Sequence, residues 1–220
     1  MRLFRNRQHA GEILATNLAA YAGRDDVLVL GLPRGGVPVA FEVARALHVP
    51  LDIFTVRKLG VPGHEEWAFG AIATGGVRIL DSDLADALGL SPRLIEQIAV
   101  RERHELERRE RSYRGDRPIP AMTGKTVIVV DDGLATGASM RAAVQALRAL
   151  GPAQIVVAVP TGARQTCDAL RRHVDALVCV TMPDPFYAVS TQYEDFQPTS
   201  DEEVCHLLAT ATGDQAATPA

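Results

Sequence analysis

The segment from Val127 to Ser139, with the sequence VIVVDDGLATGAS, constrains the fold more than any other part of this 220-residue chain. Its first four residues are all β-branched, as is typical of a central parallel strand that is buried on both faces. From Met140 onward, apolar residues recur at helical spacing, so a helix must begin close to Gly137. The intervening loop therefore turns sharply from a strand into a helix and leaves the first amide groups of that helix free.

A loop of this kind is suited to binding a phosphorylated sugar. Free amides at a helix N-terminus, the axial dipole and the hydroxyls of Thr136 and Ser139 all favour a phosphate group. The adjacent carboxylates of Asp131 and Asp132 are costly to bury unless hydroxyl groups or a cation contact them, and a ribose diol and a magnesium ion (Mg2+) would supply both. The alternative is an ordinary capped helix that follows a strand and binds nothing.

The same segment resembles the phosphoribosyl pyrophosphate binding motif of the type I phosphoribosyltransferases, in which two acidic residues and a Thr-Gly-x-Ser/Thr loop follow a hydrophobic strand. The resemblance implies that Asp131 and Asp132 bind the ribose hydroxyls and, directly or through water, Mg2+. It also implies that Gly133 binds phosphoribosyl pyrophosphate and that the loop holds the ribose 5-phosphate with the residues Ala135, Thr136, Gly137, Ala138 and Ser139. Neither a Gly-Lys-Ser/Thr ending nor a GxGxxG motif occurs, which disfavours nucleoside triphosphate and dinucleotide sites.

A second strand, loop and helix unit lies earlier in the chain, where a strand over 27–31 leads into Pro33-Arg34-Gly35-Gly36. Two glycines allow backbone amides to face an anion without a Cβ in the way. The loop resembles the short pyrophosphate loop of purine salvage enzymes in the same family, which implies that Arg34, Gly35 and Gly36 contact pyrophosphate. It also implies a cis peptide between Pro33 and Arg34. On its own, Arg-Gly-Gly would fit a plain tight turn equally well.

The segment from Arg57 to Glu66 follows a third strand, predicted over 51–56, and looks like the flexible catalytic loop of adenine phosphoribosyltransferases. The resemblance implies that Lys58 or Arg57 stabilises the leaving pyrophosphate and that Glu65 or Glu66 accepts a proton. Glutamates on a glycine-rich surface loop are also commonly just solvated. Few periodic signals occur here, so we expect a mobile loop over 59–66, with a possible strand over 68–73.

The resemblance also bears on the acceptor. Ala135 stands where the 6-oxopurine enzymes of the family carry an aspartate that exchanges a proton with the base, and adenine and uracil enzymes likewise lack a carboxylate there. This implies an acceptor other than hypoxanthine or guanine. Phe186 and Tyr187 lie where several relatives build a hood that stacks on the base, although packing of both aromatic rings in the core is an equal alternative.

Strands and helices alternate along the chain, which predicts an α/β fold with a parallel twisted sheet, helices on both faces and ligands at the carboxyl ends of the strands. We expect one domain over 1–211, with a flexible loop and helical insertion over 59–114, a hood over 182–209 and a disordered tail over 212–220. Ser91 and Pro92 predict the start of a long charged helix that ends near Tyr113. Its charges indicate either a solvated face or an arginine-rich arm over an anionic substrate.

Composition argues against several other classes of protein. The net charge of −4 and the pI near 5.9 disfavour nucleic acid as a partner. No stretch reaches the roughly 20 apolar residues that span a bilayer, and no signal peptide is visible. The three cysteines are unclustered, and no closely spaced ligand pairs indicate zinc. We therefore expect a cytoplasmic protein, and a homodimer, whose partners are small molecules.

The leading functional hypothesis is the transfer of phosphoribose from phosphoribosyl pyrophosphate to a nitrogenous acceptor, with release of pyrophosphate. A non-catalytic sensor of the sugar phosphate is the alternative. A sensor would be expected to have a basic surface or an added DNA-binding domain, and the sequence indicates neither. Synthesis of the ribose donor is a third hypothesis, which the length disfavours because that enzyme resembles two such domains in tandem with an ATP site.

Overall fold

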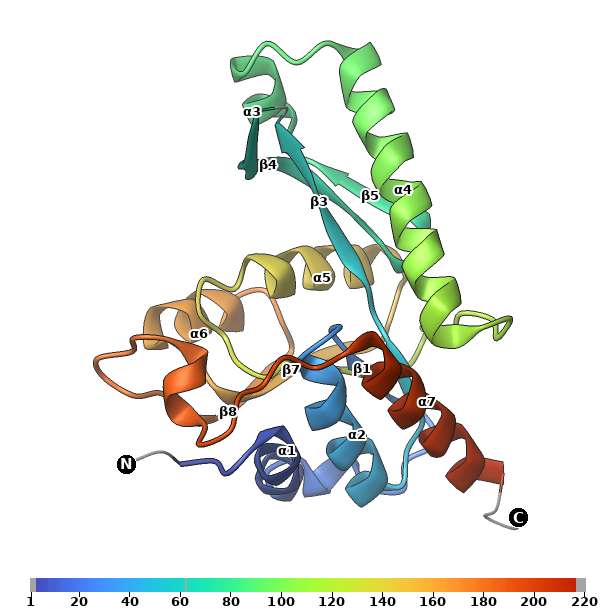
Figure 1. The fold of residues 1–220 in the computed structure, drawn as a ribbon, viewed down its shortest axis with the longest axis vertical. Coiled ribbons are helices and arrows are strands. Elements are labelled where there is room, and N and C mark those ends of the chain that lie inside the picture. The colour runs from blue at the N-terminus through green and yellow to red at the C-terminus, as the bar shows by residue number, and fades with distance from the viewer. Residues whose placement is uncertain (1–2, 62, 217–220) are drawn as a thin grey trace.

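A five-stranded parallel sheet forms the centre of the fold, in the strand order β2-β1-β6-β7-β8 (Figure 1). The computed structural model describes residues 3–61 and 63–216, without the side chains of residues 64–67 and 214–216. The strands are β1 (Val27–Gly31), β2 (Leu51–Ile53), β6 (Thr126–Val130), β7 (Gln154–Thr161) and β8 (Ala176–Thr181). Every residue of β1 and β6 is buried, which accounts for their continuous apolar sequence and confirms the predicted fold class.

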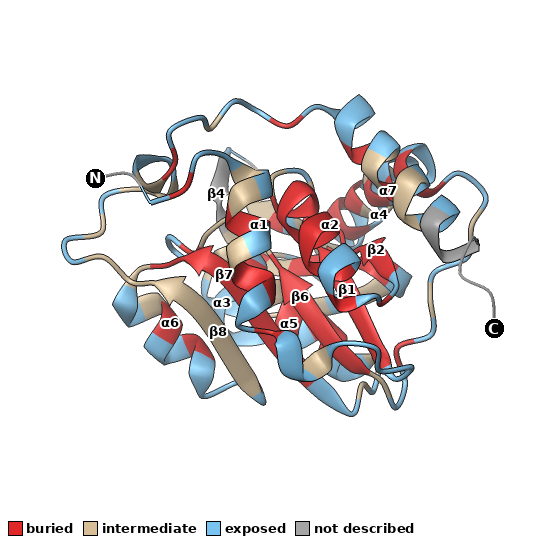
Figure 2. Ribbon diagram, turned by 90° about the horizontal axis from the view of Figure 1, so that it is seen from below, coloured by how far each residue is buried: buried red, intermediate tan, exposed pale blue. Residues whose placement is uncertain are grey.

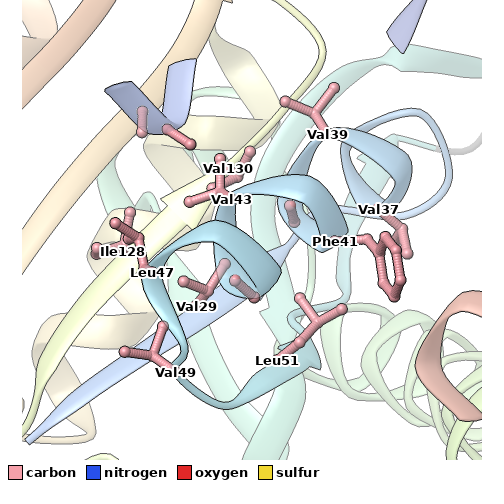
Figure 3. Close-up of a cluster of buried hydrophobic side chains, with 14 of the residues drawn as sticks. Val29, Val37, Val39, Phe41, Val43, Leu47, Val49, Leu51, Ile128 and Val130 are labelled. Atoms are coloured by element: carbon pink, nitrogen blue, oxygen red, sulfur yellow. The ribbon is translucent and has the colours of Figure 1, made fainter. Parts of the chain in front are cut away.

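Helices cover both faces of this sheet. On one face, α1 (Arg7–Thr16), α2 (Gly36–Leu47) and α7 (Asp201–Ala216) share a hydrophobic core with the strands. On the other face lie α5 (Ala138–Ala149) and α6 (Arg164–Arg171). Helix α2 is buried along most of its length because it lies between the sheet, α1 and α7 (Figure 2). Figure 3 shows side chains of α2, including Val39, Val43 and Leu47, packed with those of the central strands.

A second, antiparallel sheet stands beyond α5, away from the central sheet (Figure 1). Its strands are β3 (Val56–Val61), β4 (His64–Ala73) and β5 (Val77–Leu80), and α3 (Ser82–Ala87) and α4 (Pro92–Arg114) follow them. The segment expected as a loop over 59–66 lies instead in a hairpin of β3 and β4 that turns at Gly63, whose φ is +80°. The predicted third strand is also divided, since β2 ends at Ile53 and β3 enters the other sheet.

Helix α4 begins where the sequence predicts, with the Ser91 side chain accepting a hydrogen bond from the Leu94 amide at 3.2 Å. The expectation of a solvated helix holds only for its outer face. Its last turn is fixed to the edge of the central sheet, because Arg114 Nε donates to both oxygens of Asp52 at 2.9 and 3.1 Å, and its Nη2 donates to the Ile53 carbonyl. Three charged side chains of α4 are buried: Glu102, Glu110 and Arg114.

The segment 182–209, for which the sequence predicts a hood, is held by the N-terminal segment, and the name hood is kept for it below. Phe4 pairs with Tyr193 in a parallel β-bridge, and the Glu194 amide donates to the Phe4 carbonyl at 2.8 Å. Helix α7 begins inside the hood and continues to Ala216, so residues 212–216 are helical and not part of a disordered tail, while residues 217–220 lie outside the described residues. In the described part of the chain, no helix is both long and apolar enough to cross a membrane.

Candidate functional site

The loops after β1 and β6 meet at the point where the strand order reverses. From β1 the chain continues to β2 on one side, and from β6 it continues to β7 on the other. In open α/β sheets, ligands bind at such a switch point, outside the carboxyl ends of the strands. Gly31 and Val130 are register partners at the ends of β1 and β6, so the two predicted loops, 33–36 and 131–139, start side by side.

The 135–139 loop presents free donors, as the sequence predicts. Gly137 caps α5 in the left-handed conformation at φ +71°, and the first backbone hydrogen bond of the helix runs from the Arg141 amide to the Gly137 carbonyl at 2.8 Å. The Thr136 and Ser139 side chains are exposed, and within the described residues neither hydroxyl has a protein partner. The loop is anchored from α6, because Thr166 Oγ1 donates to the Ala135 carbonyl at 2.7 Å.

Asp131 and Asp132 bring two carboxylates to the end of β6. Burial raises the pKa of the Asp131 carboxyl well above its usual range, and the neighbouring Asp132 carboxylate adds to this shift. Burial also raises the pKa of Asp132, while Arg7 opposes that rise. Asp131 Oδ1 accepts a hydrogen bond from the Asp132 amide at 2.9 Å, so the first carboxylate is oriented by the backbone of the second. Two adjacent carboxyl groups of this kind favour a ligand that supplies hydroxyl donors or a cation.

Arg7 of α1 is a site residue that the sequence did not indicate. Its Nε and Nη2 lie 2.9 and 2.8 Å from Asp132 Oδ2, and its Nη1 donates to the Gln197 carbonyl of the hood at 2.7 Å. The guanidinium carbon lies 3.9 Å from the centre of the Phe196 ring. The side chains of Arg7 and Asp132 are only 12% and 16% exposed, so this ion pair is largely shielded from water. A basic residue near the N-terminus carries no local signal that could have revealed the contact.

The hood covers the acidic motif through residues other than those predicted. Tyr193 is buried and donates its hydroxyl to the Asp132 carbonyl at 2.6 Å, and burial raises the pKa of this hydroxyl. Val189 lies so close to Gly133 that a Cβ added there would be 2.5 Å from Val189 Cγ1. The predicted aromatics behave differently, because Phe186 is only half-buried and Tyr187 is 81% exposed. Core packing is therefore excluded for Tyr187, which stays available to a ligand.

Gly35 and Gly36 pack directly against the acidic motif. A Cβ on Gly35 would lie 2.1 Å from Asp132 Oδ2, and one on Gly36 would lie 2.7 Å from the Val130 carbonyl oxygen. A side chain larger than that of glycine would clash at both positions. The loop after β1 and the carboxylates after β6 are therefore in direct contact and form one continuous surface. The peptide between Pro33 and Arg34 is cis, as the family resemblance implied.

Arg34 is exposed beside this surface, and among the described residues its side chain makes only a long ion pair, at 3.8 Å, with Asp201 of α7. An exposed pair at this separation contributes little to stability. Its guanidinium can therefore turn toward an anion at Gly35 and Gly36 at small cost.

Arg57 and Lys58 point to opposite sides of the antiparallel sheet. Arg57 Nε donates to Glu102 Oε2 on α4 at 2.7 Å, so this guanidinium is already occupied. Lys58 is exposed and lines a cleft of about 720 Å3 between this sheet and the first half of α5. The structure therefore brings Lys58 toward the 135–139 loop and holds Arg57 away from it. Glu65 and Glu66 lie in β4, and their side chains fall outside the described part of the chain.

A metal ion would be held jointly by the protein and a ligand. Within the described residues, no group of three or more His, Cys, Asp or Glu side chains could hold a metal ion. Asp131 and Asp132 alone provide two carboxylates. This donor set fits Mg2+, which binds through one or two carboxylates together with water and substrate phosphates.

The phosphoribosyl transferase domain model matches residues 4–195. Two curated Mycobacterium tuberculosis proteins, "Putative phosphoribosyl transferase Rv0571c" of strain H37Rv and "Putative phosphoribosyl transferase MT0597" of strain CDC 1551, are each 44% identical over 214 residues. The match covers 97% of this chain and 48% of each relative, so the chain spans about half the length of the curated relatives it matches.

Two solved structures resemble the whole arrangement to different degrees. TT1426 from Thermus thermophilus is 43% identical with a TM-score of 0.82, over 96% of this chain and 99% of that chain. The match therefore extends over the antiparallel sheet and residues 182–209. AQ2163 from Aquifex aeolicus is 10% identical with a TM-score of 0.50, over 80% of this chain and 74% of that chain, which shows the fold alone.

Proposed function

The chain belongs to the phosphoribosyl transferase domain family, and on that premise we propose that it transfers phosphoribose from phosphoribosyl pyrophosphate to a nucleobase-like nitrogen acceptor. The observation that supports this proposal most is the order of three binding elements at one switch point. Free amides of the 135–139 loop, the Asp131 and Asp132 carboxylates and the Gly35-Gly36 turn follow one another. Phosphoribosyl pyrophosphate has its groups in the same order: a 5-phosphate, a ribose diol and a pyrophosphate.

Each element has a distinct task in this proposal. The 5-phosphate accepts hydrogen bonds from the amides and hydroxyls at the start of α5, where the helix dipole also favours an anion. Asp131 and Asp132 accept hydrogen bonds from the two ribose hydroxyls. The pyrophosphate lies along Gly35 and Gly36, where Arg34 turns from its weak pair with Asp201 to add positive charge.

In the reaction, the acceptor nitrogen forms a bond to the anomeric carbon while the bond from that carbon to the pyrophosphate oxygen breaks. Positive charge develops on the ribose ring, and the carboxylates beneath it stabilise that charge. Water would compete with the acceptor, so the site must be covered during transfer. In this proposal the hairpin of β3 and β4 and the exposed Tyr187 of the hood provide that cover.

Magnesium fits the donor set of Asp131 and Asp132, and when bound it would neutralise charge on the pyrophosphate. The protein supplies orientation in this proposal. The Asp132 amide fixes Asp131, and Arg7 fixes Asp132, so both carboxylates are positioned before a ligand arrives.

The acceptor is proposed to be an adenine- or uracil-type base, because Ala135 places no carboxylate where a 6-oxopurine would exchange a proton. Proton transfer, where the acceptor needs it, falls to Glu65 or Glu66 on the hairpin strand β4. Tyr187 and Phe186 provide an aromatic surface in the hood on which a flat base can stack.

A pyrophosphate-release screen tests the proposal, with phosphoribosyl pyrophosphate, magnesium and a panel of free bases. We expect release with an adenine- or uracil-type base and none with Asp131→Asn, which removes one ribose-binding carboxylate. Release that is fastest with guanine would contradict the proposed acceptor. Tight binding of phosphoribosyl pyrophosphate without release of pyrophosphate for any base would contradict the proposed transferase activity and favour the sensor hypothesis.

A further inference from the structure

Arg141 lies against the 135–139 loop. It is the fourth residue of α5, and its Nη1 would be 3.2 Å from a Cβ placed on Gly137. Its side chain is exposed and lines the cleft between α5 and the antiparallel sheet, which Ala138 and Lys58 also line. The guanidinium therefore reaches back from the first turn of the helix to the loop that opens it.

No protein group in the described part of the chain explains this position. Among the described residues, the Arg141 side chain has neither an ion pair nor a hydrogen-bond partner. Two acidic residues, Asp81 and Asp83, also line the cleft, and the Asp81 carboxylate caps α3 by accepting from the Leu84 amide at 3.0 Å. Arg148, at the other end of α5, shows the usual arrangement, because it pairs with Asp175 at 3.1 Å.

The position of the Arg141 guanidinium near the start of α5 is also electrostatically unfavourable without an anion. The N-terminus of a helix carries partial positive charge, and a cation in the first turn is repelled by it. An anion held between the free amides of the helix and the guanidinium reverses the sign of this interaction. Lys58 adds a second positive charge to the same cleft, and Asp81 and Asp83 at the start of α3 add two negative charges, so the preference for a doubly charged anion rests on the Arg141 guanidinium and the helix N-terminus beside the loop.

We propose that Arg141 is a substrate-binding residue that contacts the sugar 5-phosphate from the cleft side of the 135–139 loop. In this role it selects ligands that carry a doubly charged phosphate monoester. Backbone amides and hydroxyls supply neutral donors on one side of the phosphate, and the planar guanidinium supplies charged donors on the other. The inference rests on the proposed function, because it takes this loop as the 5-phosphate site.

Calorimetric titration with ribose 5-phosphate tests the proposal directly. Arg141→Met should bind this probe about 10- to 100-fold more weakly, which is the usual effect of losing a hydrogen bond to a charged group. Arg141→Lys should recover part of the affinity because it keeps the charge. Arg148→Met is the matched control, since it removes the same charge from the same helix two turns away and should leave the affinity unchanged.

The outcomes separate this inference from the proposed function. If the wild-type protein binds ribose 5-phosphate and Arg141→Met binds it equally well, the role of Arg141 is wrong and the 5-phosphate site stands. Equal weakening in Arg141→Met and Arg148→Met would show a general charge effect and would also overturn the inference. If the wild-type protein fails to bind the probe at millimolar concentration, the 5-phosphate site itself is wrong.

Discussion

Arg7 and Asp132 are 125 residues apart in the sequence, and their side chains meet at 2.8 Å beneath the loop after β1. The same guanidinium binds the Gln197 carbonyl and stacks on Phe196, so one side chain joins α1, the hood and the acidic motif. Because the pair is largely buried, removing either partner leaves an uncompensated charge. The position of the Asp132 carboxylate therefore depends on a residue close to the N-terminus.

The first prediction concerns this pair. Arg7→Met should lower the free energy of unfolding by about 1 to 3 kcal/mol, because Asp132 would remain buried without its counter-ion. A double-mutant cycle with Asp132→Asn, measured by urea denaturation, should give a coupling energy of about 1 to 3 kcal/mol. The exposed neighbour Arg5 provides the control, since Arg5→Met should change stability by less than about 0.5 kcal/mol. A coupling energy near zero would show that the pair contributes nothing.

The two adjacent aspartates should respond oppositely to the same substitution. Asp131→Asn removes a charge that burial and Asp132 both disfavour, so its stability should equal or exceed that of the wild-type protein by up to about 1 kcal/mol. Asp132→Asn should be destabilised, because it leaves Arg7 unpaired. Both variants should lose transfer, which the pyrophosphate-release assay measures. Normal turnover by Asp131→Asn would refute the ribose-binding role of that residue.

Gly35→Ala should disrupt the site without replacing any charged residue. The new Cβ would lie 2.1 Å from Asp132 Oδ2, and this carboxylate cannot rotate freely because Arg7 holds it. We expect a loss of stability of about 1 to 3 kcal/mol and weaker binding of phosphoribosyl pyrophosphate. Gly213→Ala is the control, because nothing lies within 4 Å of its added Cβ. Wild-type affinity in Gly35→Ala would show that the glycine is not needed there.

The raised pKa of the Tyr113 hydroxyl predicts a loss of stability at alkaline pH. Burial and a 2.5 Å hydrogen bond to Asp201 Oδ1 raise the pKa of its hydroxyl to about 12. The unfolded chain loses this proton near pH 10 and the folded protein near pH 12, so the contribution is complete below about pH 10 and falls between the two values. Urea denaturation at pH 9 and 11 should show a smaller decrease for Tyr113→Phe than for the wild-type protein. Equal decreases would contradict the shift.

The sequence predicted the parts of the site that are local in the chain. The strand, acidic pair and helix over 127–139 are specified by neighbouring residues, and the loop over 33–36 is similar, so both could be placed before the structure was known. The fold class followed from the alternation of these units. Of the hairpin of β3 and β4, only the possible strand over 68–73 was predicted, and it lies within β4. The rest was missed because its glycines and alanines carry no clear alternation, and its order comes from packing against α4 and α5.

Contacts between distant segments could not be predicted from one sequence. Arg7 shows no local pattern that points to Asp132, and Tyr193 resembles any other aromatic residue of the hood. Cys167 and Cys179 are unclustered in the sequence, yet both thiols border Gly162, where an added Cβ would be 2.6 and 3.5 Å from their Sγ atoms. The family resemblance left open whether Lys58 or Arg57 contacts the pyrophosphate. The structure distinguishes the two residues, because they lie on opposite faces of β3 and Arg57 is paired with Glu102.

Calorimetric titration of the wild-type protein with phosphoribosyl pyrophosphate and magnesium tests the central claim most directly, with a thermal melt recorded on the same samples. We predict saturable binding, and at a ligand concentration ~100 times the dissociation constant the folded state should gain about 2.7 kcal/mol. Asp131→Asn, which keeps the fold, should lose most of this gain. The absence of both heat and a melting shift at millimolar ligand would contradict the assignment of residues 131–139 as a phosphoribosyl pyrophosphate site.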